Sequence, residues 1–131
     1  MQLPVTSLVA AGCATLLLIL AIDTIRHRLR AKVAFGDGGD ARLTSASRAH
    51  GNLAEHAPIV LIMLGLLEYN QADHAMLLLI GKVFLLGRIS HAIGLYAPSA
   101  PGKAPIPRQI GVVITFGTIA VLAAMLLVRL V

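Results

Sequence analysis

Arg48, Asn52 and Glu55 lie at helical spacing in the run R-A-H-G-N-L-A-E-H-A-P at 48–58. At 3.6 residues per turn, their side chains fall within an arc of about 60° on one helix face. An arginine-rich face with an amide and a carboxylate suits a ligand that carries several carboxylates and one ammonium, because guanidinium binds carboxylate in bidentate geometry. Glu55 would pair with Arg48 or with the ammonium group. This face is therefore a candidate binding site.

The same face is expected to lie within a membrane. The uncharged run between Glu55 and Glu68 is shorter than the roughly 20 residues that a helix needs to cross the hydrocarbon, so the span must begin near Arg48. Charged side chains at this depth cost about 2.5–3.5 kcal/mol each on insertion scales and usually face a bundle interior or a cavity. We therefore expect Arg48, Asn52 and Glu55 to face the interior of a helix bundle. His50 points away from them, toward a neighbouring helix or another subunit.

Arg88 and His91 repeat this pattern three residues apart, in the run G-R-I-S-H at 87–91. Residues at i and i+3 are neighbours on a helix, so both polar groups are expected at the depth of the first site. Glutathione fits the combined chemistry, and a cation near its sulfur would favour the nucleophilic thiolate without any protein base. Arg108 and Lys103 are the candidates for that cation. No metal site is predicted.

The composition is that of an integral membrane protein. Of the 131 residues, 57% are hydrophobic and 13% are charged, and the mean hydropathy is +0.84, which is far more apolar than a soluble domain. Residues 1–22 and 109–128 carry no charged side chain, and each run is long enough to span the bilayer. We predict a single all-α domain over residues 1–131, an integral membrane four-helix bundle. The expected helices cover residues 3–32, 41–69, 75–96 and 108–129.

The basic residues that give the net charge of +5 follow the connections between these helices. The first and third connections are basic, whereas the second, around residues 68–74, contains no Lys or Arg. By the positive-inside rule, the first and third connections are cytoplasmic and both termini lie on the far side. No aromatic platform accompanies the basic flanks, so nucleic acid is not an expected partner. The one cysteine, Cys13, lies in an apolar helix, where packing is its expected role.

Together these motifs resemble the MAPEG family, the membrane-associated proteins in eicosanoid and glutathione metabolism, and in particular its bacterial members. The likeness rests on the runs at 48–58 and 87–91, on K-A-P-I-P-R at 103–108, and on a G-D-G-G-D loop at 36–40. It covers nearly the whole chain. The resemblance implies a homotrimer of four-helix subunits that binds glutathione between subunits, near the cytoplasmic side.

Carried over by position, the resemblance implies glutathione contacts from residues of several helices. They are Arg30, Arg48, His50, Asn52, Glu55, Arg88 and His91. Arg30 stands for the cation at the end of the first helix that would reach an adjacent subunit's glutathione, with Arg26, Arg28 and Lys32 as alternatives. Arg108 resembles the arginine that stabilises the thiolate, and Lys103 competes for this role. Leu95 replaces a tyrosine of similar eicosanoid-pathway members, so no particular eicosanoid reaction is implied.

We therefore predict a glutathione-dependent membrane transferase, with peroxidase activity as a second option, that conjugates or reduces hydrophobic electrophiles. The alternative is a non-catalytic lipid-binding or scaffold membrane protein of the same fold. A small drug exporter is a third option, but it would need an embedded carboxylate in the first helix, and Asp23 lies too near the basic flank. The expected location is the bacterial inner membrane. The expected partners are further copies of the chain in a homotrimer, membrane lipids and a hydrophobic small-molecule substrate.

Overall fold

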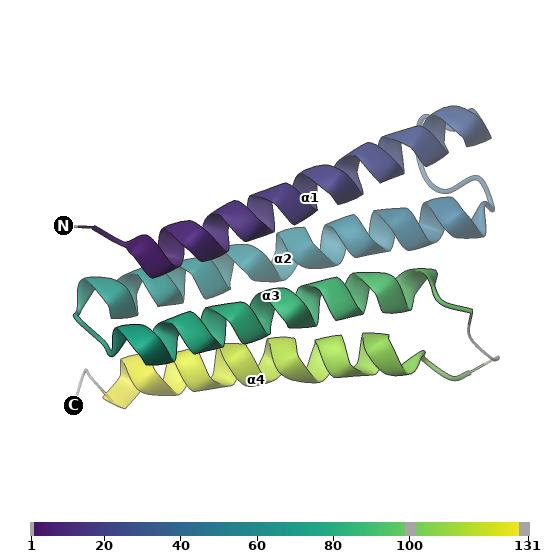
Figure 1. The fold of residues 1–131 in the computed structure, drawn as a ribbon. Coiled ribbons are helices and arrows are strands. Elements are labelled where there is room, and N and C mark those ends of the chain that lie inside the picture. Colours follow the sequence, from purple (N-terminus) through teal and green to yellow (C-terminus); the bar gives the residue numbers. More distant parts are fainter. Residues whose placement is uncertain (1, 99–101, 129–131) are drawn as a thin grey trace.

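The computed structural model describes residues 2–98 and 102–128, which form a bundle of four long helices (Figure 1). The prediction of an all-α four-helix bundle is confirmed, and all four helices are long and apolar enough to cross a membrane. The expected start of the fourth helix at 108 falls two residues late, and its expected end at 129 lies outside the described residues. The helices are α1 (Pro4–Ala31), α2 (Ala41–Tyr69), α3 (His74–Tyr96) and α4 (Ile106–Val128).

The helices α2 and α3 form the centre of the bundle. Both α1 and α4 pack against these two helices, and α1 and α4 do not contact each other within the described residues. The α1–α2 and α3–α4 connections lie at one end, which we name the basic end, whereas the α2–α3 turn lies at the other (Figure 1). The largest fully buried side chains of the core come from all four helices. They include Val9, Leu53, Leu64, Leu77, Phe84 and Leu122.

Glu68 ties the start of α1 to the end of α2. The N-cap residue of α1, Leu3, provides no side-chain hydrogen bond. The Glu68 carboxylate instead accepts hydrogen bonds from the backbone N–H groups of Val5 and Thr6, both at 2.8 Å, and from the Thr6 hydroxyl at 2.7 Å. A helix N-terminus carries unpaired N–H groups and a partial positive charge. The carboxylate therefore stabilises α1 and fixes the α1–α2 pair at the end away from the basic end.

Aspartate side chains define the starts of α2 and α3. Asp40 accepts hydrogen bonds from the N–H groups of Arg42 and Leu43 at 2.8 and 2.9 Å, and Asp73 accepts one from the N–H group of Met76 at 2.7 Å. N-caps of this kind contribute typically about 1 kcal/mol each. The start of α2, and with it the register of its polar residues, is therefore fixed by local sequence.

Two glycines let α3 and α4 approach closely near the basic end. Gly111 packs against His91 and the carbonyl group of Gly87, and Gly94 packs against the backbone of Arg108. A methyl group at either glycine would overlap these neighbouring atoms. The start of α4 is therefore held against the end of α3, which places Arg108 close to His91.

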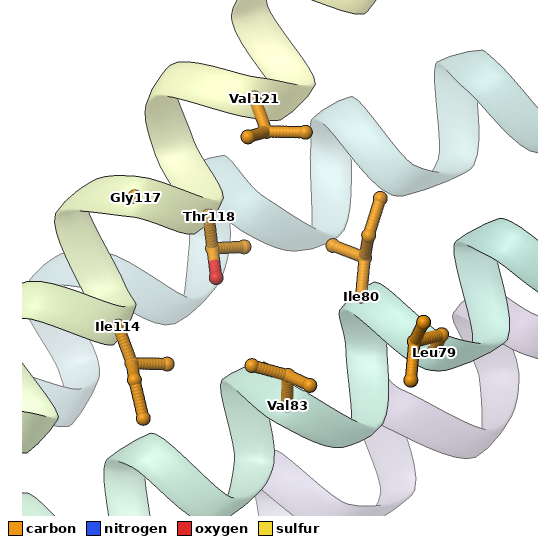
Figure 2. Close-up of a pocket in the computed structure, with 7 residues that line it drawn as sticks. All are labelled: Leu79, Ile80, Val83, Ile114, Gly117, Thr118 and Val121. Atoms are coloured by element: carbon orange, nitrogen blue, oxygen red, sulfur yellow. The ribbon is translucent and has the colours of Figure 1, made fainter.

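An open apolar groove lies between α3 and α4, farther from the basic end than these glycines (Figure 2). Its volume is about 320 Å³, and a Cβ atom at Gly117 would meet no other atom within 4 Å. Exposed apolar surface of this kind marks contact with a membrane or a partner. The side chains that line it are Leu79, Ile80 and Val83 of α3 and Ile114, Thr118 and Val121 of α4.

Gly111→Ala should destabilise the bundle, because the added methyl group overlaps His91 and the Gly87 carbonyl group. We expect a loss of about 1–3 kcal/mol in the free energy of unfolding, as for overpacked cores. Gly117→Ala is the matched control: its methyl group enters open space, and alanine favours a helix over glycine by up to about 1 kcal/mol. Reversible unfolding in mixed detergent micelles measures both variants. Equal effects would contradict the proposed role of Gly111.

Candidate functional site

The polar face of α2, formed by Arg48, Asn52 and Glu55, lies on the outside of the four-helix bundle. Arg48 and Glu55 are exposed, and Asn52 is half-buried. The Asn52 side-chain amide donates a hydrogen bond to the Arg48 carbonyl group at 2.9 Å. The expectation that this face points into the bundle interior is therefore wrong for a single copy of the chain. His50 is half-buried.

Burial of apolar residues explains this orientation of α2. Its interior side is a stripe of small and aliphatic residues, each at most 7% exposed, which repeats every three or four positions. Such a stripe covers one continuous helix face, and the polar residues lie outside it. The polar face is consequently left free for a ligand or a second copy of the chain. The stripe consists of Ala46, Ala49, Leu53, Ala57 and Val60.

His56 joins α2 to α4 beside the polar face. Its ring centroid lies 5.9 Å from that of Phe116, and its Nδ1 atom lies 2.7 Å from the Asn52 carbonyl oxygen. Both helices run away from the basic end (Figure 1). Arg48 precedes His56, and Arg108 precedes Phe116, by the same eight residues, which is about 12 Å along each helix. The exposed Arg108 therefore lies at the level of Arg48 on a contacting helix.

Arg88 and His91 lie in the bundle interior, each 3% exposed. Arg88 Nη1 donates a hydrogen bond to the Thr115 hydroxyl at 3.0 Å, and Arg88 Nη2 lies 3.5 Å from His91 Nδ1. The Thr115 hydroxyl donates in turn to the Gly111 carbonyl group at 2.7 Å. The buried Nε atom of Arg88 has no hydrogen-bond partner among residues 2–98 and 102–128. The two residues predicted on one face thus share a buried polar centre with α4.

This buried guanidinium is connected to the polar face through charge. Among the described residues, the ion pair with a nitrogen–oxygen distance of at most 4.0 Å is that between His27 and Asp23. Arg88 therefore has no carboxylate within this distance in the described part of the chain. Glu55 acts on Arg88 electrostatically from a greater distance. An unpaired buried charge costs several kcal/mol. The Glu55 carboxylate therefore attracts the Arg88 guanidinium only at long range, and no direct contact joins the two groups.

Thr115 was not among the predicted site residues. It is 1% exposed and is the partner that accepts a hydrogen bond from Arg88. The sequence did contain an indication of its role: Thr115 is a hydroxyl residue in an almost wholly apolar helix, where a buried hydroxyl group needs a polar partner. Spacing within α4 alone gave no indication that the partner would come from α3.

Arg28 and Arg30, near the end of α1, line different hollows. Arg28 Nη1 donates hydrogen bonds to the carbonyl groups of Ala34 and Gly36 at 3.3 and 3.0 Å, and Arg28 shares a hollow of about 340 Å³ with Arg48. Arg30 lines another hollow. Within one copy, Arg28 rather than Arg30 is therefore the first-helix cation beside Arg48. The alternative cations Arg26, Lys32 and Lys103 are exposed.

Asp37 adds a carboxylate to the hollow that contains Arg28 and Arg48. Hydrogen bonds from the Gly39 backbone N–H group at 3.1 Å and from the Thr44 hydroxyl at 2.9 Å lower the pKa of Asp37. The carboxylate is therefore ionised at neutral pH beside the two arginines. In the described part of the chain, no group of three His, Cys, Asp or Glu residues is arranged to hold a metal ion.

Comparison with known proteins places these features in a family. The model of the MAPEG family matches residues 6–128. The chain is similar to inner membrane protein YecN of Escherichia coli strain K12, with 39% identity over 92 residues, which cover 70% of this chain and 70% of the relative. The protein of the same name from Escherichia coli O6:H1 matches to the same extent. No solved structure matches the chain.

Thr115→Val should destabilise the protein, because the buried Arg88 side chain loses a hydroxyl acceptor. Leaving a buried donor unpaired costs about 1–3 kcal/mol. Thr118→Val is the control, since Thr118 is also buried in α4 but is not a partner of Arg88. Unfolding free energies in detergent compare the two. The same loss in both variants would show that the Arg88–Thr115 bond contributes nothing specific.

Proposed function

The chain belongs to the MAPEG family, and on this basis we propose that it is a glutathione-dependent membrane transferase, with peroxidase activity as a second reaction, that acts on hydrophobic electrophiles. The observation that carries the proposal is the polar face of α2, which lies within a candidate membrane span and yet outside its own bundle. Exposed charges at this depth need partners, because each costs about 2.5–3.5 kcal/mol on insertion scales. A charged peptide ligand is one such partner.

Glutathione is complementary to the groups on this face. Its two carboxylates suit the exposed guanidinium group of Arg48 and a cation from the end of α1, which leaves Arg108, at the level of Arg48 on a contacting helix, for the sulfur. Its ammonium group suits the Glu55 carboxylate, and Asn52 adds an amide. His50 lies half-buried on the same helix. In this proposal, Arg88 and His91 are buried too deeply in one copy to touch the ligand, and the positive charge of Arg88 attracts Glu55 at long range.

The exposure of this face also supports assembly into a homotrimer. A second copy that covered the face would remove Arg48 and Glu55 from lipid and could contribute a cation from the end of its α1. Arg30 remains our assignment for that cation, with Arg26 and Lys32 as exposed alternatives. Arg28 is less suited, because its guanidinium is already bonded to its own loop. Each glutathione would then lie between two copies, near the basic end.

Arg108 is assigned to the thiolate. A guanidinium beside the sulfur stabilises the anion, so the thiol releases its proton to water without a protein base. The sulfur lone pair then forms a bond to the electrophilic carbon, and the leaving group, such as the chloride of a chloronitrobenzene, departs with its bonding electrons. The hydrophobic substrate would reach this sulfur from the lipid. The basic end would face the cytoplasm, as the positive-inside rule indicates, and the membrane would be a bacterial inner membrane, as for the relative that is named an inner membrane protein.

The buried polar centre favours a second candidate function. Arg88 contacts both His91 and Thr115 in the bundle interior, as expected of a polar centre that fixes helix packing. In this alternative the chain is a non-catalytic lipid-binding or scaffold protein of the same fold, and the polar face of α2 serves only assembly. The two candidates differ in what Glu55 contributes.

Titration calorimetry with glutathione and a conjugation assay with a chloronitrobenzene test the leading proposal. Arg108→Ala should lower turnover by about 10²–10³-fold, the usual effect of removing one group that stabilises a developing anion, and should abolish the ultraviolet absorbance of the bound thiolate. Glutathione affinity should fall by less than about tenfold, or 1.4 kcal/mol. Lys103→Ala is the matched control and should change neither. Absence of glutathione binding by the unmodified protein would refute the proposal.

Glu55→Gln separates the two candidates. The transferase proposal predicts a loss of at least about tenfold in glutathione affinity, because the ammonium group loses its carboxylate, with the oligomer intact. The scaffold alternative predicts that the oligomer dissociates. Native mass spectrometry reports the oligomer and calorimetry reports the affinity. Lys82→Gln serves as a control, since Lys82 is exposed on α3 and lies outside the proposed site.

A further inference from the structure

A second polar pocket opens at the basic end, between α1, the start of α2 and the end of α3. Its volume is about 590 Å³. Arg30 is the one residue that it shares with the proposed glutathione site, and none of the proposed contacts on α2, α3 or α4 lines it. The polar residues that line it are Asp23, His27, Arg30, Arg42, Ser45 and Tyr96.

Asp23 is already satisfied by side chains of the pocket wall. The Tyr96 hydroxyl donates a hydrogen bond to Asp23 Oδ2 at 2.6 Å, and His27 Nε2 lies 3.7 Å from Asp23 Oδ1. The first of these contacts joins α3 to α1. The carboxylate of Asp23 is therefore occupied within the wall rather than paired with the arginines of the pocket.

The guanidinium groups of Arg30 and Arg42 have no hydrogen bond or ion pair with any described residue. Both side chains are exposed. Asp40 acts on Arg42 and His27 electrostatically, but its carboxylate accepts hydrogen bonds from the Arg42 and Leu43 N–H groups as the N-cap of α2. The partial positive charge of the helix N-terminus offsets this acid. The pocket therefore presents two unpaired cations to any group that enters it.

The position of the pocket along α1 corresponds to the level of lipid head groups. Residues 4–22 carry no charged side chain, and Asp23 is the first charged residue of the helix. The 28 residues of α1 extend about 42 Å, which exceeds the roughly 30 Å of hydrocarbon, so its last turns reach beyond the acyl chains. Basic pockets between membrane helices at this level bind phosphate-containing head groups.

We propose that this pocket binds a phosphate group, supplied by the head group of an anionic phospholipid in the adjoining leaflet. Arg30 and Arg42 donate paired hydrogen bonds to the phosphate oxygens, the geometry in which guanidinium binds phosphate. Ser45 supplies a further hydroxyl donor from α2. The bound head group connects α1 to α2 at the basic end, where the bond between Tyr96 and Asp23 already connects α1 to α3.

The test uses the full-length protein in detergent, titrated with phosphatidylglycerol, phosphatidylcholine or inorganic phosphate and observed by native mass spectrometry. We expect one tightly held phosphatidylglycerol per chain and no comparable binding of phosphatidylcholine. The double variant Arg30→Gln, Arg42→Gln should lose at least about tenfold in affinity for phosphatidylglycerol. The double variant Arg26→Gln, Lys32→Gln removes the same charge from exposed positions of the basic end that do not line the pocket, and should keep the affinity.

Equal binding of the two lipids, or equal losses in the two double variants, would overturn the proposal. Binding of inorganic phosphate that depends on Arg30 and Arg42, without binding of phosphatidylglycerol, would overturn the lipid as the source. If the Arg30, Arg42 double variant fails to fold, Arg42→Glu alone should show the same loss. The proposed function already assigns Arg30 to glutathione, so it predicts a fall in glutathione affinity in the first double variant. Phosphatidylglycerol that stays bound to that variant would overturn the pocket whatever happens to glutathione affinity, whereas unchanged glutathione affinity with loss of phosphatidylglycerol would remove Arg30 from the glutathione site alone.

Discussion

Charged side chains within the membrane-spanning length of the chain are the constraint on which the rest of this structure depends. The bundle satisfies part of it internally, since Arg88 is buried against Thr115 and His91 and is influenced by Glu55. The remainder lies outside, because Arg48 and Glu55 are exposed on the surface of a single copy. Facing lipid, such groups would be strongly unfavourable. The fold of one chain is therefore electrostatically incomplete, which is what a site shared between copies and a charged ligand would correct.

The positions of these charges follow from a few close contacts between helices. Gly94 and Gly111 allow the start of α4 to lie directly against α3, and the rings of His56 and Phe116 meet between α2 and α4. Together they bring Arg108 to the level of Arg48. At the opposite end, the Glu68 carboxylate fixes the start of α1. Backbone packing thus sets the geometry of the site, whereas the charged side chains themselves form few direct contacts with one another.

Helix positions and shared helix faces could be predicted from the sequence, because apolar runs and capping residues are local signals. The spacing of Arg48, Asn52 and Glu55 showed that they share a helix face. It did not show that the alanine-rich stripe around Leu53, rather than this polar face, would be buried in the bundle interior. That outcome depends on which face buries more apolar surface against the other helices. The partners Arg88–Thr115 and Tyr96–Asp23 also escaped prediction, since each joins residues distant in sequence. Such pairs are determined by helix arrangement, which local periodicity does not specify.

A cryo-electron microscopy map of the protein purified with glutathione tests the central claim most directly. The account predicts that the outer face of α2, with Arg48 and Glu55, lies against the α1 helix of another copy, and that density for the tripeptide fills the space between them, with its sulfur near Arg108. A map in which this face meets only lipid or detergent, with no tripeptide density beside it, would contradict the account.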